Sequence, residues 1–293
     1  MVFMSALIAA VIGFFLGGVI NWLADYLPDY ELPRRPRYPD GTPRPVAAWL
    51  GTTAFLTNRR CTNAAERVCL SWRYPITEFA TAIAFFITVL RIAAINNNTP
   101  QFINTTQMLF HLFYIGVFVL IFVIDVEHHL ILFNVILPSC AVALLDAALT
   151  PADGVAVQWW HASLEPTLIE ALIGAALGFG VFFLFYLGGF AYLRVSEAIR
   201  GWAPQEVPFG YGDVMLITLC GLILGWRPLI FAMFLTVFLG SLGALLVIIY
   251  TKVRGGSGGF QIALPYGPYI IAGVVAVMLF NTWIQWLLFE IVY

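Results

Sequence analysis

Charged residues are scarce in this chain. Only 10% of its 293 residues are charged and 61% are hydrophobic, whereas a soluble domain has roughly 25% charged residues. Several uninterrupted apolar runs approach or exceed the about 20 residues that a helix needs to cross a bilayer. The composition therefore excludes an ordinary soluble domain and predicts an all-α polytopic membrane protein. The net charge of −2 indicates little about partners.

Cysteines are scarce as well, and the features of a signal peptide are missing. The chain has four cysteines, of which Cys140 and Cys220 lie within apolar runs. A buried, unreactive thiol is the ordinary interpretation there. Cys61 and Cys69 share a polar segment instead. The first apolar run, residues 2–23, has no basic start and no small-residue cleavage site, so we expect a retained helix rather than a signal peptide.

The apolar runs predict about eight transmembrane helices, of which the sixth is short and could be partly re-entrant or buried by its neighbours. Their expected ranges are 3–24, 75–95, 106–125, 130–149, 166–193, 213–226, 228–250 and 267–292. The main polar segment, 25–73, is rich in proline and arginine and predicts an ordered loop domain on the membrane surface. We therefore divide the chain into a first transmembrane helix (1–24), this loop domain (25–73) and a membrane-embedded domain (74–293).

Basic residues fall almost entirely on one side of the predicted helices. Of the 14 lysines and arginines, eight lie in loop 25–73, two in loop 194–212 and two in loop 251–266. Arg91 and Arg227 are the two on the opposite side. Because short loops rich in lysine and arginine stay in the cytoplasm, we expect the basic side to be cytoplasmic and the N-terminus to lie outside.

Two aspartates occupy the expected cytoplasmic ends of helices. Asp213 follows Gly210 and Gly212 and opens the apolar run 214–226, while Asp125 ends an earlier run. A carboxylate near the hydrocarbon costs roughly 2.5 kcal/mol or more, and the glycines would let another backbone approach. Two neighbouring carboxylates share one proton. One could then act as general base on a water while the other donates a proton to a scissile carbonyl.

Three interpretations of these aspartates stay open at this point: peptide hydrolysis, capping or ion pairing, and transport of ions or protons. Capping fits Asp213, since a helix N-terminus favours negative charge, but fits Asp125 poorly at a helix C-terminus. Glu127, His128 and His129 follow Asp125 in an expected tight turn. Neighbouring positions cannot all converge on one ion, so we predict a solvated turn and no metal site.

The segments around the aspartates belong to a longer pattern of five motifs in chain order. The motifs are Gly17-Gly18-Val19-Ile20-Asn21 with Leu27-Pro28; Tyr74-Pro75-Ile76-Thr77-Glu78; Ile124-Asp125-Val126-Glu127-His128-His129 with Pro138; Gly210-Tyr211-Gly212-Asp213-Val214-Met215-Leu216 with Gly225-Trp226; and Pro265-Tyr266-Gly267-Pro268. With these motifs the chain resembles the type IV prepilin peptidases, which are integral-membrane aspartic proteases, over nearly its full length.

The resemblance implies a membrane aspartic endopeptidase. Such enzymes cut the basic leader from type IV prepilins or pseudopilins at the cytoplasmic face of a prokaryotic inner membrane. Asp125 and Asp213 would be the catalytic pair. The residues expected to shape the site are Gly210, Gly212, Glu78, Pro265, Gly267 and Pro268. From the residues alone, Glu78 could either face the aspartates or interact with the dipole at the start of its own helix.

The resemblance also bears on cofactors. Many relatives methylate the new N-terminus with S-adenosylmethionine, an activity associated with the loop domain, whereas the peptidase reaction needs no cofactor. Many relatives also carry two Cys-x-x-Cys pairs there, spaced to hold zinc. This chain has only Cys61 and Cys69, so we expect no zinc, no disulfide in the cytoplasm, and a loop held by packing of Pro45, Trp49 and Trp72.

The expected partners are a prepilin or pseudopilin and the lipid bilayer, and no nucleic acid; the oligomeric state is left open. A basic leader would be met by acidic side chains, for which Glu127, Glu206 and Asp40 are the candidates. The alternative functions are a catalytically silent membrane scaffold subunit of the same fold and, more remotely, an ion or proton pathway.

Overall fold

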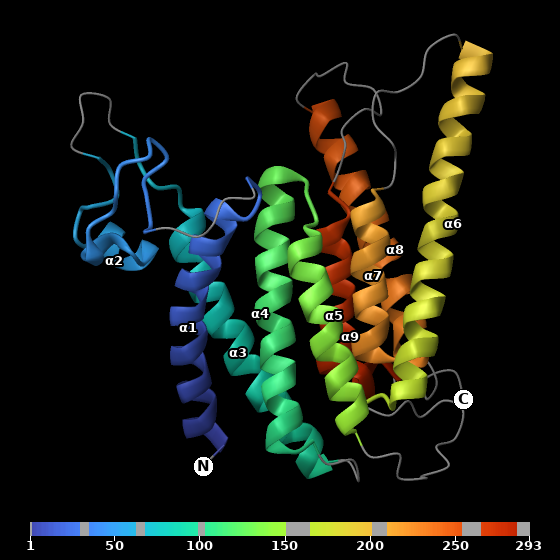
Figure 1. Ribbon diagram of the computed structural model, residues 1–293, viewed down its shortest axis with the longest axis horizontal. Coiled ribbons are helices and arrows are strands. Elements are labelled where there is room, and N and C mark those ends of the chain that lie inside the picture. The colour runs from blue at the N-terminus through green and yellow to red at the C-terminus, as the bar shows by residue number, and fades with distance from the viewer. Residues whose placement is uncertain are drawn as a thin grey trace. The chain divides into compact units, whose positions relative to one another are not determined.

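The computed structural model describes residues 2–29, 35–62, 68–98, 103–150, 165–200, 210–253 and 265–285 of the chain. The chain forms two compact units, Met1–Leu130 and Ile131–Tyr293. In chain order the helices are α1 (Val2–Tyr26), the 3₁₀ helix η1 (Val46–Ala48), α2 (Gly51–Leu56), α3 (Arg73–Asn98), α4 (Thr105–His128), α5 (Phe133–Leu149), α6 (Leu168–Arg200), α7 (Tyr211–Leu224), α8 (Trp226–Val253) and α9 (Gly267–Gln285) (Figure 1).

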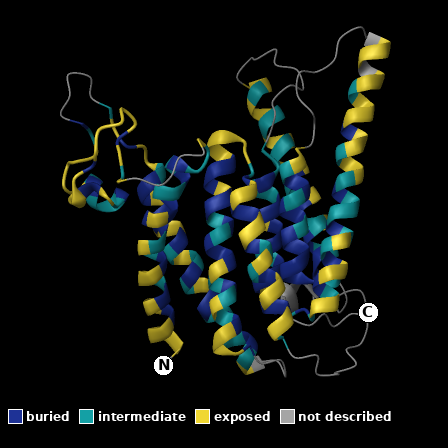
Figure 2. Cartoon of the chain, in the orientation of Figure 1, coloured by how far each residue is buried: buried dark blue, intermediate teal, exposed yellow. Residues whose placement is uncertain are grey.

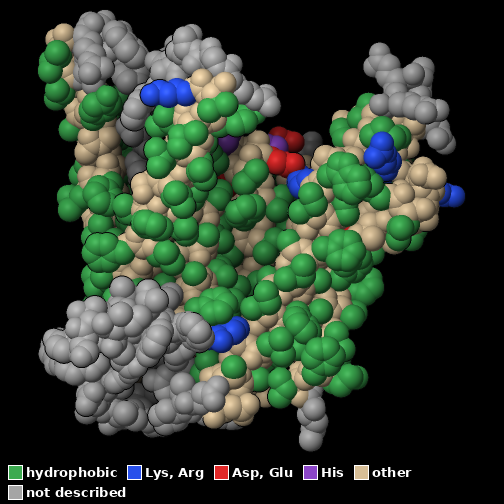
Figure 3. Space-filling view, turned by 180° about the vertical axis from the view of Figure 1, so that it is seen from behind, with side chains coloured by type: hydrophobic (Ala, Val, Ile, Leu, Met, Phe, Trp, Pro, Cys, Tyr) green, Lys and Arg blue, Asp and Glu red, His purple; other side chains and the backbone are tan. Residues whose placement is uncertain are grey.

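Each of the eight predicted apolar helices is present within the described ranges. Among them, α1, α3, α4, α6 and α8 are long and apolar enough to cross a membrane, and α5, α7 and α9 are shorter apolar helices. Hydrophobic side chains cover most of the described surface on the face shown in Figure 3. Exposed apolar surface of this extent marks contact with a membrane. An all-α membrane protein is therefore supported, while the number and direction of the spans stay predictions.

In the first unit, α1 packs along α3, and both contact α4. Two glycines four residues apart on α1 allow this packing. A Cβ on Gly13 would lie 2.8 Å from the carbonyl oxygen of Thr81, and one on Gly17 would lie 2.6 Å from the Cα of Glu78. Small residues at this spacing let membrane helices approach backbone to backbone. The glycines of α1 thus decide how closely α3 can lie.

The loop domain between α1 and α3 has a small core of its own. Its buried residues are Tyr38, Ala48, Ala54, Leu70 and Tyr74, with Phe55 packed against them. The prediction that Pro45 and Trp49 hold this loop by packing is wrong, since both are exposed. Trp72 is exposed as well, but its ring centre lies 4.7 Å from that of Phe55. Ala48 of η1 and Ala54 of α2 face this core, whereas Val46 and Leu56 are exposed.

Cys61 and Cys69 form a disulfide, so the prediction that these thiols stay unpaired is wrong. The chain on either side of them pairs as an antiparallel bridge. The N–H of Thr62 donates to the carbonyl of Val68 at 3.0 Å, and the N–H of Leu70 donates to the carbonyl of Arg60 at 2.8 Å. This backbone pairing sets the two cysteines opposite each other, which an argument from the redox compartment did not take into account.

In the second unit, α7 is the central helix and contacts α5, α6, α8 and α9. Most of its 14 residues are buried (Figure 2), which fits the second of the two alternatives for the short sixth helix, burial by its neighbours. It contacts α6 at two glycines. A Cβ on Gly174 would overlap the carbonyl oxygen of Gly221, and a Cβ on Gly221 would overlap the carbonyl oxygen of Gly174. A helix of this length spans about 21 Å, less than the about 30 Å of a hydrocarbon core. Its polar first turn therefore depends on neighbouring helices for shielding.

The predicted helix limits differ from the observed ones mainly on α6. This helix runs through Arg200, about two turns beyond the expected end at residue 193. Arg194 and Arg200 therefore lie on a helix rather than in a loop.

Candidate active site

Asp125 lies in the last turn of α4, and the helix continues beyond it. Glu127 and His128 are helical, and the helix ends at His129, a left-handed residue with φ of 53° whose N–H donates to the carbonyl of Asp125 at 2.9 Å. The prediction of a tight turn over these residues is therefore wrong for Glu127 and His128. Asp125 is only 4% exposed. Its carboxylate is buried at the end of the helix where the dipole opposes negative charge.

Asp213 lies in the first turn of α7. Its Oδ2 accepts a hydrogen bond at 3.2 Å from the backbone N–H of Gly210, the residue that precedes the helix. Asp213 is 9% exposed. A carboxylate in this position satisfies an N–H outside the helical ladder and lies at the end where the dipole favours negative charge. Capping therefore accounts for part of the role of Asp213.

Two other segments of the second unit approach this first turn. A Cβ on Gly212 would lie 2.8 Å from the Cβ of Ile131, so a residue without Cβ is required there. At Gly210 the nearest atom to an added Cβ would be Oδ2 of Asp213, at 3.3 Å. Tyr266 is the other neighbour: burial and, after it, the negative charge of Asp213 raise the pKa of the Tyr266 phenol. The late motif thus lies within electrostatic reach of Asp213.

The motif at residues 265–268 forms the start of α9. Gly267 is the first helical residue and Pro268 lies in the first turn, where proline removes only an N–H that has no helical partner. Two N–H groups of this turn donate to the carbonyl of Tyr266, directly after Pro265. A Cβ on Gly240 of α8 would lie 2.8 Å from the Tyr266 ring. The motif therefore sets the start of α9 against α8, and α9 also contacts α7.

Glu78 is fully buried on α3. Its two carboxylate oxygens accept the backbone N–H groups of Gly51 and Thr52, at 2.5 and 2.8 Å. These are the first residues of α2, so the side chain of Glu78 satisfies two N–H groups that the helix leaves without helical partners. Glu78 therefore attaches the loop domain to α3, a role that the sequence did not indicate. That Glu78 also shapes the active site stays a prediction.

A shielded cluster of charges, which the sequence analysis missed, joins α1, α3, α4 and the loop domain. Asp25 accepts hydrogen bonds from Arg44 at 3.1 Å, from the Tyr74 hydroxyl at 2.9 Å, and from Arg73. Arg73 also pairs with Glu127. The side chain of Arg44 is 2% exposed. The signal in the sequence was an aspartate at the end of an apolar helix, just before an arginine-rich segment.

The three candidate leader contacts lie in different settings. The side chain of Glu127 is 34% exposed and pairs with Arg73. Asp40 is exposed in a turn, where its Oδ1 accepts the N–H and the hydroxyl of Thr42 at 2.9 and 2.7 Å. These hydrogen bonds lower the pKa of Asp40. Glu206 lies outside the described residues.

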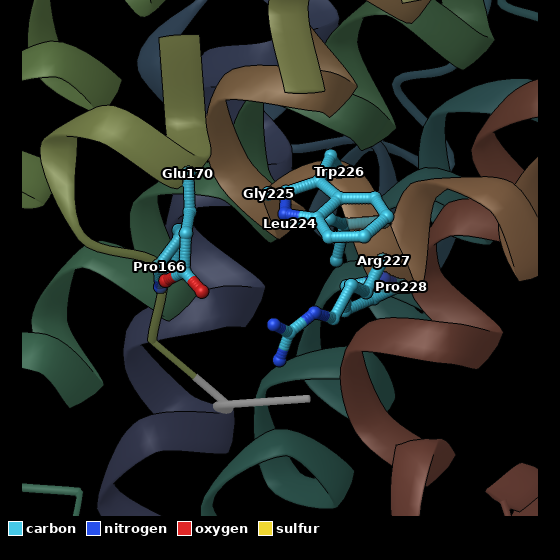
Figure 4. A pocket seen from close by; sticks show the side chains of 7 residues that line it. All are labelled: Pro166, Glu170, Leu224, Gly225, Trp226, Arg227 and Pro228. Atoms are coloured by element: carbon cyan, nitrogen blue, oxygen red, sulfur yellow. The ribbon is translucent and has the colours of Figure 1, made fainter. Parts of the chain in front are cut away.

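A small pocket lies at the opposite end of α7 from Asp213. Its lining residues are Pro166, Glu170, Leu224, Gly225, Trp226, Arg227 and Pro228 (Figure 4). Glu170 accepts the N–H of Thr167 at 3.1 Å, and the Arg227 guanidinium lies 5.1 Å from the Trp226 ring centre. The full length of α7 separates this pocket from the predicted site. Within the described ranges, no group of three or more His, Cys, Asp or Glu side chains could hold a metal ion.

The part of the chain that matches a known protein family includes both Asp125 and Asp213. Residues 112–245 match the type IV leader peptidase family. The chain is 27% identical over 214 residues to a prepilin leader peptidase/N-methyltransferase of Pseudomonas aeruginosa, covering 72% of this chain and 60% of that protein. It is 28% identical over 238 residues to the protein of the same description from Pseudomonas putida, covering 80% of this chain and 68% of the relative.

A third relative, a prepilin leader peptidase/N-methyltransferase of Burkholderia pseudomallei, is 30% identical over 131 residues, 44% of this chain and 36% of the relative. The chain thus matches between about a third and two thirds of the length of these relatives. No solved structure matches the chain. The matched family segment begins within α4 before Asp125, ends within α8, and includes Asp213 at the start of α7. Over residues 112–245, the chain is therefore similar to the type IV leader peptidase family.

Proposed function

We propose that this protein is a membrane aspartic endopeptidase that removes the basic leader of type IV prepilins or pseudopilins. The observation that carries the proposal is that the family match includes Asp125 and Asp213, each buried in an end turn of a helix. Relatives described as prepilin leader peptidases support the same substrate class. Buried carboxylates at the ends of membrane helices are costly, which favours a catalytic purpose over an incidental one.

In the proposed reaction the two carboxylates come together around the substrate and share one proton. The ionised carboxylate takes a proton from water, which attacks the scissile carbonyl carbon while the protonated carboxyl donates to the carbonyl oxygen. Collapse of the tetrahedral diol then passes a proton to the departing nitrogen. We assign the base to Asp213, whose place at a helix N-terminus favours negative charge, and the acid to Asp125, whose place does not.

The proposed site faces the cytoplasm of a prokaryotic inner membrane. The asymmetry of the 14 basic residues supports this orientation, because basic loops are retained in the cytoplasm. A pilin-like substrate is itself an apolar helix preceded by a basic segment, so it could enter from the bilayer with the leader at the polar end. Glu206 and Asp40 are the proposed acidic contacts for that leader, whereas Glu127, the third candidate, is paired with Arg73.

The test is processing of a co-expressed prepilin by the wild type, Asp125→Asn and Asp213→Asn. We expect each variant to lose cleavage by at least about 10²- to 10⁴-fold, the usual contribution of a general acid or base. Asp29→Asn, which changes an exposed aspartate, is the matched control and should cleave normally. Normal cleavage by either variant of the pair would sink the proposal.

Two alternatives give different results in the same system. A catalytically silent scaffold predicts no processing by the wild type. An ion or proton pathway predicts proton flux in liposomes that disappears in either aspartate variant.

Methylation of the product is a second proposed activity, supported by the words N-methyltransferase in the relatives' descriptions. The mass of the product's first residue after incubation with S-adenosylmethionine reports it. Zinc does not fit the described loop, because Cys61 and Cys69 are bonded to each other and neither is then a thiolate ligand.

A further inference from the structure

Arg73 bridges two carboxylates that belong to different helices. It is the first residue of α3. Its Nη2 donates to Oδ1 of Asp25 on α1, and its Nη1 donates to Oε2 of Glu127 on α4. The Arg73 side chain is 15% exposed, so solvent screens these pairs less than pairs on an open surface. A guanidinium presents several donors in one rigid plane, which allows one side chain to connect three helices.

The Asp25 end of this bridge is fixed by the loop domain. Oδ2 of Asp25 accepts from Nη2 of Arg44 at 3.1 Å, and the Tyr74 hydroxyl donates to Oδ1 at 2.9 Å. Arg44 is itself held, because its Nε donates to the carbonyl of Arg37 at 2.6 Å and its guanidinium lies 4.5 Å from the Tyr74 ring centre. Asp25 therefore has a defined position, and Arg73 takes its orientation from it.

The Glu127 end of the bridge lies two residues beyond Asp125. The last turn of a helix has carbonyl groups without helical partners and is the part that frays first. Here the N–H of the left-handed His129 donates to the carbonyl of Asp125. The ion pair between Arg73 and Glu127 adds a side-chain contact to this same last turn of α4.

We infer that Arg73 is a positioning residue for Asp125: it holds the last turn of α4 in place through Glu127. The inference rests on the proposed function in so far as Asp125 is catalytic. It also assigns Glu127 to the support of α4 in place of direct leader binding. Misplacing a catalytic group by 1 Å can cost about 100-fold in rate, so a tie two residues away has a measurable effect on turnover.

The kinetic test uses the full-length protein in lipid with a prepilin substrate. We expect Arg73→Gln and Glu127→Gln each to lower kcat by about 10- to 100-fold and to leave KM nearly unchanged. The double variant should be no worse than the poorer single variant, because both changes remove one interaction. Arg59→Gln, which neutralises an exposed arginine of the same loop domain, is the control and should match the wild type. Additive losses in the double variant would overturn the inference.

A substrate with a neutralised leader separates this inference from direct leader binding by Glu127. If Glu127 only positions α4, Glu127→Gln lowers kcat equally for the basic and the neutral leader. If Glu127 instead binds the leader, the variant raises KM for the basic leader and has no effect on the neutral one. That second result would also overturn the inference.

Hydrogen exchange tests the role of the Arg73–Glu127 pair without relying on peptidase activity. In Arg73→Gln, amide exchange over residues 125–129 should rise several-fold, whereas exchange over 112–120 of the same helix should stay unchanged. Glu127→Gln cuts the tie from its other end and leaves the Arg73–Asp25 pair intact, so it serves if Arg73→Gln does not accumulate. Unchanged exchange in both variants would refute the positioning role. Absence of cleavage by the wild type would instead sink the proposed function and leave the exchange result valid.

Discussion

Gly210 and Gly212, the glycines on either side of Tyr211, have different surroundings. Gly212 packs against Ile131, and an added Cβ there would lie 2.8 Å from the Ile131 Cβ. Gly210 has φ of −81° and ψ of 146°, an extended conformation that any residue adopts. From the sequence, both glycines were expected to shape the site beside Asp213. The structure indicates that only Gly212 is required by close packing.

Gly212→Ala should therefore be much more harmful than Gly210→Ala. We expect Gly212→Ala to lower the free energy of unfolding by about 1–3 kcal/mol, the usual cost of overpacking, and to reduce prepilin cleavage because the Asp213 turn shifts. Thermal unfolding and cleavage assays measure the two effects. Ile131→Gly added to Gly212→Ala removes the Cβ that clashes and should recover part of the loss. Equal effects of the two glycine substitutions would contradict this explanation.

Glycines spaced four residues apart determine which helices come into backbone contact. Gly13 and Gly17 of α1 meet α3, and Gly174 and Gly178 of α6 meet α7. Gly-x-x-x-Gly is a known signal for close helix packing in membranes, but it does not name the partner helix. These contacts hold α7 in the centre of its unit, and with it the turn that carries Asp213.

Gly174→Val tests this packing, with Gly180→Val as the matched control on the same helix. A Cβ on Gly174 would overlap the backbone of Gly221, whereas a Cβ on Gly180 would have no atom within 4 Å. We expect the first substitution to destabilise the protein by about 1–3 kcal/mol and the second to change stability by less than about 0.5 kcal/mol. Thermal unfolding in detergent measures both. A loss at Gly180 as large as that at Gly174 would show that the α6–α7 contact is not the cause.

At the scale of the whole molecule, the basic residues and the disulfide give opposite indications of orientation. The arginines of loop 25–73 favour the cytoplasm. The Cys61–Cys69 disulfide favours the opposite side, because disulfides are rare in the cytoplasm. We follow the basic residues, because the count draws on three separate segments of the chain, whereas the disulfide is one local pairing.

Reporter fusions after residues 58, 150 and 253 test the orientation. We expect the fusions at 58 and 253 to report the cytoplasm and the fusion at 150 to report the outside, following the positive-inside rule. A fluorescent protein and a periplasmic phosphatase as paired reporters give opposite signals at each position. If the fusion at 58 reports the outside, the expected orientation is wrong and the disulfide lies in an oxidising compartment.

The sequence by itself determined the apolar helices and the helix-end positions of Asp125 and Asp213. These features depend on the length of apolar runs and on local turn residues, which can be read in one dimension. Only the tertiary structure decided the partners of Glu78, the Cys61–Cys69 pairing and the bridge through Arg73. Arg73 meets carboxylates 48 and 54 residues away along the chain. Such contacts depend on which helices pack together, and helix packing follows from backbone approach at small residues rather than from local pattern.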